Sequence, residues 1–277
     1  MAARPDDEGQ LAAARRGDRA AFDALFEPEI PKLRGVLRRL VGTSDDVDDL
    51  VQQSLLRAFE QLEGFRGEAG VGTWLCSIGT RLGIDLLRSR KRWRERAQVI
   101  LAARCLEDEA LGREVGSSLG RPDFQYDVGE HIAYCFTCVG RTLSPPAQAA
   151  LVLRDVLQLS NDEAARAVNV SRSVLRHELA GARKQMQETY AGLCAVVSKT
   201  GACWQCAGLR QASPEGKRGP DVPVALDWEG RLRIVRQAAL DRGYSSALHD
   251  VLFRQTEAQE ASGAGDEDAA TECGRGP

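Results

Sequence analysis

The stretch "LSPPAQAALVLRDVLQLSNDEAARAVNVSRSVLRHELAGARKQM", residues 143–186, decides the fold class of this chain. Two prolines open its first segment, at the first helical turn, where proline is tolerated. Ser160 followed three residues later by Glu163 is the pattern of a capping box at the start of a second helix. After the short turn Asn169-Val170, a third segment has the apolar stripe of another helix. Helix, tight turn and helix at this size predict a helix-turn-helix.

The N-terminal part of the chain also has helical periodicity. Residues 18–42 carry apolar side chains at gaps of three and four, and Pro28 and Pro31 are expected to divide them into two helices. Ser44 or Asp45 is expected to cap the next helix. Residues 73–97 predict a long helix that is apolar early and basic late, and residues 227–259 predict one or two helices. The predicted fold class is therefore all-α.

The predicted architecture is two small helical domains joined by a linker, followed by a partly helical C-terminal extension. The expected boundaries are 1–96 for the first domain, 97–129 for the linker, 130–193 for the helix-turn-helix domain and 194–277 for the extension. The linker has mixed charge, scattered glycine and no sustained period. The acidic, glycine-rich end of the extension has the composition of a disordered segment.

Composition limits the partners of the chain. Its net charge is −3, so any affinity for nucleic acid must come from local basic patches or from a partner protein. No secretory signal and no run of about 18 apolar residues is present, so we expect no export and no membrane span. A cytoplasmic location follows as an expectation, and the eight cysteines would then be reduced.

Two segments are candidates for binding nucleic acid. Between Arg81 and Arg96 stand seven basic residues against two acids, flanked by Trp74 and Trp93. Aromatic rings beside cations suit single-stranded nucleic acid, although a solvated helix face and a core role for Trp74 are the alternatives. The opening residues of a recognition helix that begins near Ser171 would reach base edges in a major groove. A helical hairpin that binds no nucleic acid is the alternative there.

The order and spacing of these segments resemble an extracytoplasmic-function (ECF) sigma factor of bacterial RNA polymerase, over residues 8–96 and 130–190. "DDVDDLVQQSLLRAF", residues 45–59, looks like the polymerase-binding helix of the family. Residues 65–92 are similar to its promoter-melting segment, and residues 143–186 look like its second DNA-binding domain. The resemblance implies a protein that binds core polymerase and directs promoter recognition and transcription initiation. It also implies that the chain is not an enzyme.

The resemblance implies three sets of contact residues. Those facing the polymerase would be Asp45, Asp48, Asp49, Leu50, Gln52 and Gln53. Those beside the minus-ten promoter element would be Thr73, Trp74, Arg81, Asp85, Arg88, Arg90, Lys91 and Arg92. Those at the minus-thirty-five element would be Ser171, Arg172, Ser173, Arg176 and His177, with Arg183 and Lys184 near phosphate. Glu178 departs from the arginine usual in the family, and its carboxylate repels phosphate but accepts from a cytosine amino group.

Two cysteine pairs suggest a metal site. "HIAYCFTC", residues 131–138, places His131, Cys135 and Cys138 on one face of a helix, and "GACWQC", residues 201–206, supplies a second pair. A zinc ion held by Cys135, Cys138, Cys203 and Cys206, with His131 and Cys194 as alternates, is the expectation. A redox or metal-responsive switch and ordinary buried cysteines are the alternatives. The HxxxCxxC pattern also resembles the metal-binding helix of zinc-containing anti-sigma factors.

Two rival functions stay open at this point. One is a stand-alone helix-turn-helix repressor or activator, which would bind duplex DNA without polymerase. The other is a protein-interaction module that has lost DNA binding, as Glu178 would allow. The C-terminal extension would either fold back on the chain as a built-in regulator or bind a separate anti-sigma factor.

Overall fold

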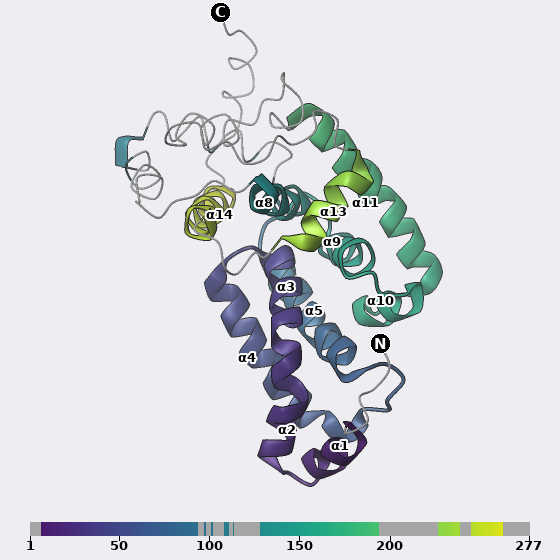
Figure 1. The fold of residues 1–277 in the computed structure, drawn as a ribbon. Helices are drawn as coiled ribbons and strands as arrows, with labels where there is room; N and C mark the ends of the chain where they lie inside the picture. Colours follow the sequence, from purple (N-terminus) through teal and green to yellow (C-terminus); the bar gives the residue numbers. More distant parts are fainter. Residues whose placement is uncertain are drawn as a thin grey trace, which may run out of the picture. The chain divides into compact units, whose positions relative to one another are not determined.

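The computed structural model describes residues 7–93, 97, 101, 108–110, 113, 128–193, 227–238 and 245–262. Every regular element in these residues is helical, which confirms the all-α prediction (Figure 1). The first helices are α1 (Asp7–Arg15), α2 (Arg19–Phe26), η1 (Glu27–Glu29), α3 (Ile30–Val41), α4 (Ser44–Glu60), η2 (Leu62–Gly64) and α5 (Val71–Ser89). They are followed by α8 (Val128–Gly140), α9 (Pro145–Leu151), the π-helical turn η3 (Val152–Val156), α10 (Asn161–Val168), α11 (Arg172–Leu193), α13 (Trp228–Gln237) and α14 (Ser245–Ser262).

The chain folds into two compact units, and each unit combines two separate stretches of sequence. The first unit contains Met1–Arg88 and Pro145–Ala182, and the second contains Ser89–Ser144 and Arg183–Pro277. The helix-turn-helix of α10 and the start of α11 therefore lies in the same unit as helices α1 to α5. The four domain boundaries expected from the sequence stay a prediction.

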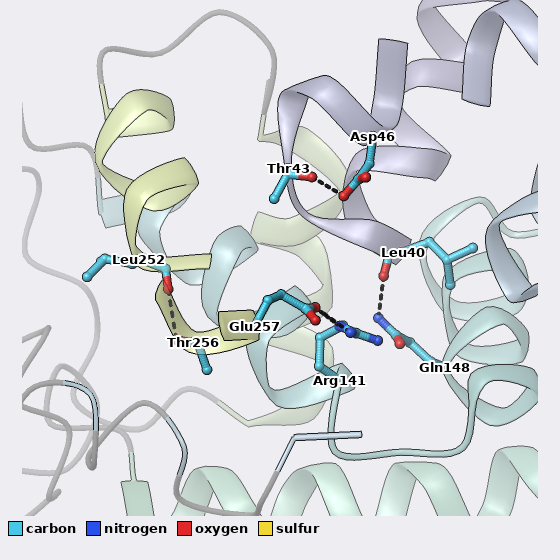
Figure 2. A network of polar contacts seen from close by, with 8 residues as sticks. All are labelled: Leu40, Thr43, Asp46, Arg141, Gln148, Leu252, Thr256 and Glu257. Carbon is cyan, nitrogen blue, oxygen red and sulfur yellow. Dashed lines mark hydrogen bonds and ion pairs between the residues drawn. The ribbon is translucent and has the colours of Figure 1, made fainter. Parts of the chain in front are cut away.

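Local signals set the helix boundaries of the first unit. Pro28 lies in η1 and Pro31 in the first turn of α3, so the two prolines divide the segment as predicted. The cap of α4 is Thr43, one residue before the expected Ser44, and its hydroxyl donates to the Asp46 carboxylate (Figure 2). Helix α5 ends at Ser89 rather than near residue 97, and no specific sequence pattern predicted α1.

Two glycines let α5 pack closely on α3. The buried stripe of α3 includes Leu33 and Leu40, which are fully shielded from solvent. A Cβ atom at Gly79 would lie 2.5 Å from Cδ1 of Leu33, and one at Gly83 would lie 2.6 Å from Cδ2 of Leu40. Both separations are shorter than any carbon–carbon contact, so the close approach of these helices requires glycine at the two positions.

The helix-turn-helix forms as the sequence predicts. Ser160 Oγ accepts from the Glu163 amide at 3.2 Å, and the Glu163 carboxylate accepts from the Ser160 amide at 2.9 Å, which completes the capping box. These hydrogen bonds from Ser160 hold the pKa of Glu163 below its usual value. Asn169 ends α10 in the left-handed conformation, with φ of 57°. Ser171 Oγ accepts from the Val174 amide and caps α11.

Helices α13 and α14 form part of the second unit. Phe253 of α14 packs on Trp93 in a tilted arrangement with ring centroids 4.8 Å apart, in a buried cluster with Cys138 of α8. Arg141, which follows α8, is 2% exposed and forms an ion pair with Glu257 of α14 (Figure 2). In α13, the Arg231 guanidinium lies 3.7 Å from the centre of the Tyr190 ring. Residues 227–259, where one or two helices were expected, thus contain α13 and most of α14, and both helices pack on the chain itself.

Candidate nucleic-acid interface

A pocket of about 250 Å³ lies between the loop before α5, helix α5 and helix α10, all within the first unit. Thr73, Trp74 and Arg81, which were expected to bind DNA, line it. The Trp74 ring also packs on Phe65 at 4.9 Å, so one part of this side chain belongs to the core and another part to the pocket. Both alternatives considered for Trp74 therefore describe the same half-buried side chain.

Arg81 has an exposed side chain whose donors are directed to the end of α10. Its Nε donates to the Ala167 carbonyl at 3.1 Å, and one Nη donates to the Arg166 carbonyl at 2.8 Å. Carbonyls in the last turn of a helix have no partner within the helix and form its negative pole. The Arg81 guanidinium, which was expected to contact DNA, therefore caps the C-terminal end of α10.

The basic cluster after Arg81 is exposed in part. Arg88 forms an ion pair with Asp85 at 3.2 Å, and both side chains are more than half exposed. Beyond the end of α5, Arg90 is half-buried, whereas Lys91 and Arg92 are exposed.

Trp93 does not fit the stacking role considered for it. It is only 3% exposed and packs on Phe253. A ring held in this way is shielded from bases, so among the two flanking tryptophans only Trp74 borders the pocket.

The opening turns of α11 present a polar surface. Its exposed members are Ser171, Arg172, Ser173, Arg176 and His177. Arg172 lies 3.7 Å from Asp162 of α10, and Glu178 is half-buried. Further along, Arg183 is half-buried and Lys184 is exposed, 3.9 Å from Glu188. This surface has the composition expected of a helix that reads base edges.

Val174 is a surface residue, although the helical spacing of Val174, Leu175, Leu179, Ala182 and Met186 predicts one buried stripe. The rest of that stripe, from Leu175 to Met186, is buried as predicted, but Val174 is 46% exposed. Val174 lies three residues after the N-cap Ser171, and this position was the signal in the sequence that could have predicted its exposure. An exposed valine among polar groups is suited to contact a thymine methyl group.

The outer face of α4 is acidic and apolar. Asp45, Asp48, Asp49, Gln52 and Gln53 are exposed, and Asp48 forms an ion pair with Arg34. Leu50 is only 4% exposed and belongs to the core, so a direct partner contact no longer fits it. The face continues instead through Leu56, which is 62% exposed, and Phe59, which is 42% exposed. Neither was predicted at this face, because the helical spacing of Val47, Leu50, Val51, Leu55 and Phe59 predicts one buried stripe that includes Phe59.

The cysteines differ in their surroundings. Burial raises the pKa of Cys76 to about 12, with Lys32 opposing and Glu29 reinforcing the shift, so this thiol is an unreactive core group. Cys135 is half-buried and Cys138 is buried, while Cys194, Cys203 and Cys206 lie outside the described residues. Among the residues that the structure describes, no group of three or more His, Cys, Asp and Glu side chains is arranged to hold a metal ion.

His131 is paired with a histidine of α14. Its Nδ1 lies 3.4 Å from Nε2 of His249, and the His249 ring stacks on Tyr134 at 3.8 Å. Burial, with the positive charge of Arg231, lowers the pKa of His131 to about 4. His131 is therefore neutral near pH 7.

Within the described part of the chain, no helix is long and apolar enough to cross a membrane.

Comparison with known proteins gives three results. Residues 25–93 match the family model of sigma-70 region 2, which contains the α4 face and the pocket residues of α5. Over 183 residues the chain is 34% identical to ECF RNA polymerase sigma factor SigG of Mycobacterium tuberculosis, covering 62% of this chain and 49% of SigG. Over 190 residues it is 27% identical to the ECF RNA polymerase sigma-E factor of Haemophilus influenzae, covering 68% of this chain and 96% of that protein.

Among solved structures, the chain is similar to CnrH in complex with the cytosolic domain of CnrY, at 26% identity and a TM-score of 0.41. The match covers 66% of this chain and 95% of CnrH. The chain spans about half the length of SigG, the relative with the higher identity of the two compared above.

Proposed function

We propose that this chain is an ECF sigma factor of bacterial RNA polymerase, which binds core polymerase and directs it to promoters. The observation that carries the proposal is the exposed face of α4, which lies within the matched region 2. Its carboxylates suit a basic partner surface, and exposed Leu56 and Phe59 supply the apolar contact that a modest electrostatic attraction alone would lack. The chain would act in the cytoplasm and direct initiation without catalysing a reaction itself.

Promoter DNA would meet two separate surfaces. The non-template strand would lie along the pocket lined by Thr73, Trp74 and Arg81, with the cluster from Arg88 to Arg92 pairing with phosphates. The opening turns of α11 would enter the major groove at the minus-thirty-five element. Helices α13 and α14 pack on α8 within the second unit, so the C-terminal extension would act as a built-in regulator. A separate anti-sigma factor would then bind another surface, such as the α4 face.

Core binding and transcription test this proposal together. Full-length protein should co-purify with core polymerase and support run-off transcription from the chain's own upstream region. The variant Asp49→Arg with Gln53→Arg should lose both, because two positive charges would replace an acid and an amide on the exposed face. Arg16→Glu, at an exposed position after α1, is the charge-change control. Sequence-specific footprinting by the free chain, without any polymerase binding, would instead establish the stand-alone repressor or activator.

The cysteine pairs are proposed to share one zinc ion. Cys135 and Cys138 stand on the same face of α8, and Cys203 and Cys206 would complete a four-thiolate site, which is the set that zinc favours. His131 is engaged with His249, which makes it the weaker candidate of the two alternates. Metal content by mass spectrometry should show one equivalent in the parent and none in the variant Cys203→Ser with Cys206→Ser. A zinc-free parent with unmodified thiols would return these cysteines to a core role.

A further inference from the structure

Helix α1 precedes the residues that match region 2, yet its last residue is bonded to the segment that leads into the pocket. Arg15 Nε donates to the Leu62 carbonyl at 3.4 Å, and one Arg15 Nη donates to the Phe65 carbonyl. The two carbonyls lie 47 and 50 positions further along the chain, in η2 and directly after it. A guanidinium suits this task, because its planar fork directs several donors from one rigid group.

The segment held by Arg15 continues as one wall of the pocket. Its residues in the pocket lining are Gly64, Phe65, Arg66, Glu68 and Ala69. The Phe65 ring is 7% exposed and packs on Trp74, the aromatic residue of the pocket. Gly67 turns the chain in the left-handed region, with φ of 71°. The positions of Arg66 and Glu68 therefore follow from the backbone at Phe65.

The anchoring of this segment is concentrated at two residues. Leu62 and Phe65 are buried, whereas Arg66, Gly67 and Glu68 are exposed. The carbonyls that Arg15 holds belong to these two buried residues. An exposed loop samples several conformations unless it is tied to a rigid element, and a loop ordered before its ligand arrives binds that ligand better. Arg15 supplies such a tie from α1.

We propose that Arg15 is a positioning residue for promoter opening, which holds residues 62–70 in the shape that receives the non-template strand. The inference rests on the proposed function, because it takes the pocket as the site of that strand. Arg15 acts through the carbonyls of Leu62 and Phe65, without pairing with a phosphate itself. The loop then offers the Arg66 guanidinium as a donor and the Glu68 carboxylate as an acceptor at fixed positions. Selection of a base in the pocket thereby depends on a residue that lies outside region 2.

Strand opening by holoenzyme tests this role. Full-length Arg15→Met keeps an aliphatic stem and removes every donor, and Arg16→Met removes the same charge from the adjacent exposed position. Core binding should be unchanged in both variants. Permanganate reactivity of thymines at the minus-ten element should fall roughly three- to tenfold in Arg15→Met alone, because two hydrogen bonds that order the loop are lost. Discrimination between bubble templates that differ in one non-template base should fall by a similar factor.

Salt dependence separates positioning from a direct phosphate contact. Arg15→Met should leave the slope of log affinity for the bubble template against log salt unchanged, whereas one lost phosphate contact would lower it by about 0.7–0.9. Arg15→Lys keeps the charge without the planar fork, so it should restore opening only in part. The melting temperature of the free Arg15→Met chain should equal that of Arg16→Met.

Four results would overturn the inference while the proposed function stands. They are parent-like opening and selectivity in Arg15→Met, a reduced salt slope, full rescue by Arg15→Lys, and a lower melting temperature with equally weakened binding of every template. The last of these would show a purely structural role for Arg15. A parent chain that does not bind core polymerase would overturn the proposed function, and this inference with it.

Discussion

Replacing Glu257 by leucine should destabilise the second unit strongly, because it leaves the Arg141 guanidinium buried without its carboxylate. Arg141 is 2% exposed and Glu257 is 18% exposed, so neither charge is well hydrated in the folded state. Removing one partner of a buried ion pair costs about 3–5 kcal/mol of unfolding free energy. For a unit of about 150 residues this corresponds to a fall in melting temperature of about 6–20 °C.

A double-mutant cycle measured by calorimetry and urea unfolding of the full chain separates this effect from lost packing. Arg141→Met should cost less than Glu257→Leu, because water reaches the partly exposed Glu257 carboxylate once its partner is gone. The double variant should return to within about 2 kcal/mol of the parent, since well-packed apolar replacements are tolerated. Glu188→Leu, which removes an exposed pair with Lys184, should change stability by less than about 1 kcal/mol. A loss below 1 kcal/mol for Glu257→Leu, or a double variant no more stable than that single variant, would refute the reasoning.

Three further outcomes are expected. Because the pKa of His131 is about 4 in the folded chain and about 6.5 when unfolded, its stabilising effect is full above pH 6.5 and is lost as pH falls toward 4, by roughly 1.4 kcal/mol per pH unit. Urea unfolding at pH 7, 5.5 and 4.5 should show this slope in the parent and a shallower one in His131→Phe. Arg88→Ala with Arg92→Ala should reduce the slope of log affinity against log salt for holoenzyme and promoter by about 1.4–1.8, and an unchanged slope would mean that these residues form a solvated face. Val174→Ala should weaken holoenzyme binding only at promoters with a thymine opposite this position, as measured with matched promoters that differ in one base pair.

The features of this fold that could be predicted from the sequence are those that depend on interactions between residues close in sequence. The Ser160–Glu163 capping box, the turn at Asn169-Val170 and the proline breaks each depend on residues a few positions apart. The segments predicted to bind polymerase, residues 45–59, and to melt the promoter, residues 65–92, both lie within the region 2 match over residues 25–93. These features could be read from the chain because their stabilising partners lie within one helical turn.

The parts that escaped prediction depend on partners distant in sequence. Trp93 lies next to a run of basic residues, but Phe253 covers its ring, and no local sequence pattern predicts that contact. The periodicity of α4 assigned Phe59 to the core, whereas neighbouring helices leave it 42% exposed. The Arg81 contacts span 85 and 86 positions and join segments that the family resemblance treats as separate. Tertiary packing determines which face of a helix is exposed and which distant side chain caps a helix, so a single sequence does not reveal either.

The ion pair between Arg141 and Glu257 also determines how late in synthesis the second unit can complete its folding. The two residues are 116 positions apart, so a ribosome adding about 5–20 residues per second makes Glu257 about 6–23 s after Arg141. During that interval Phe253 and the rest of α14 do not yet exist to cover α8. A chaperone therefore has a defined time window in which to bind the nascent chain at α8.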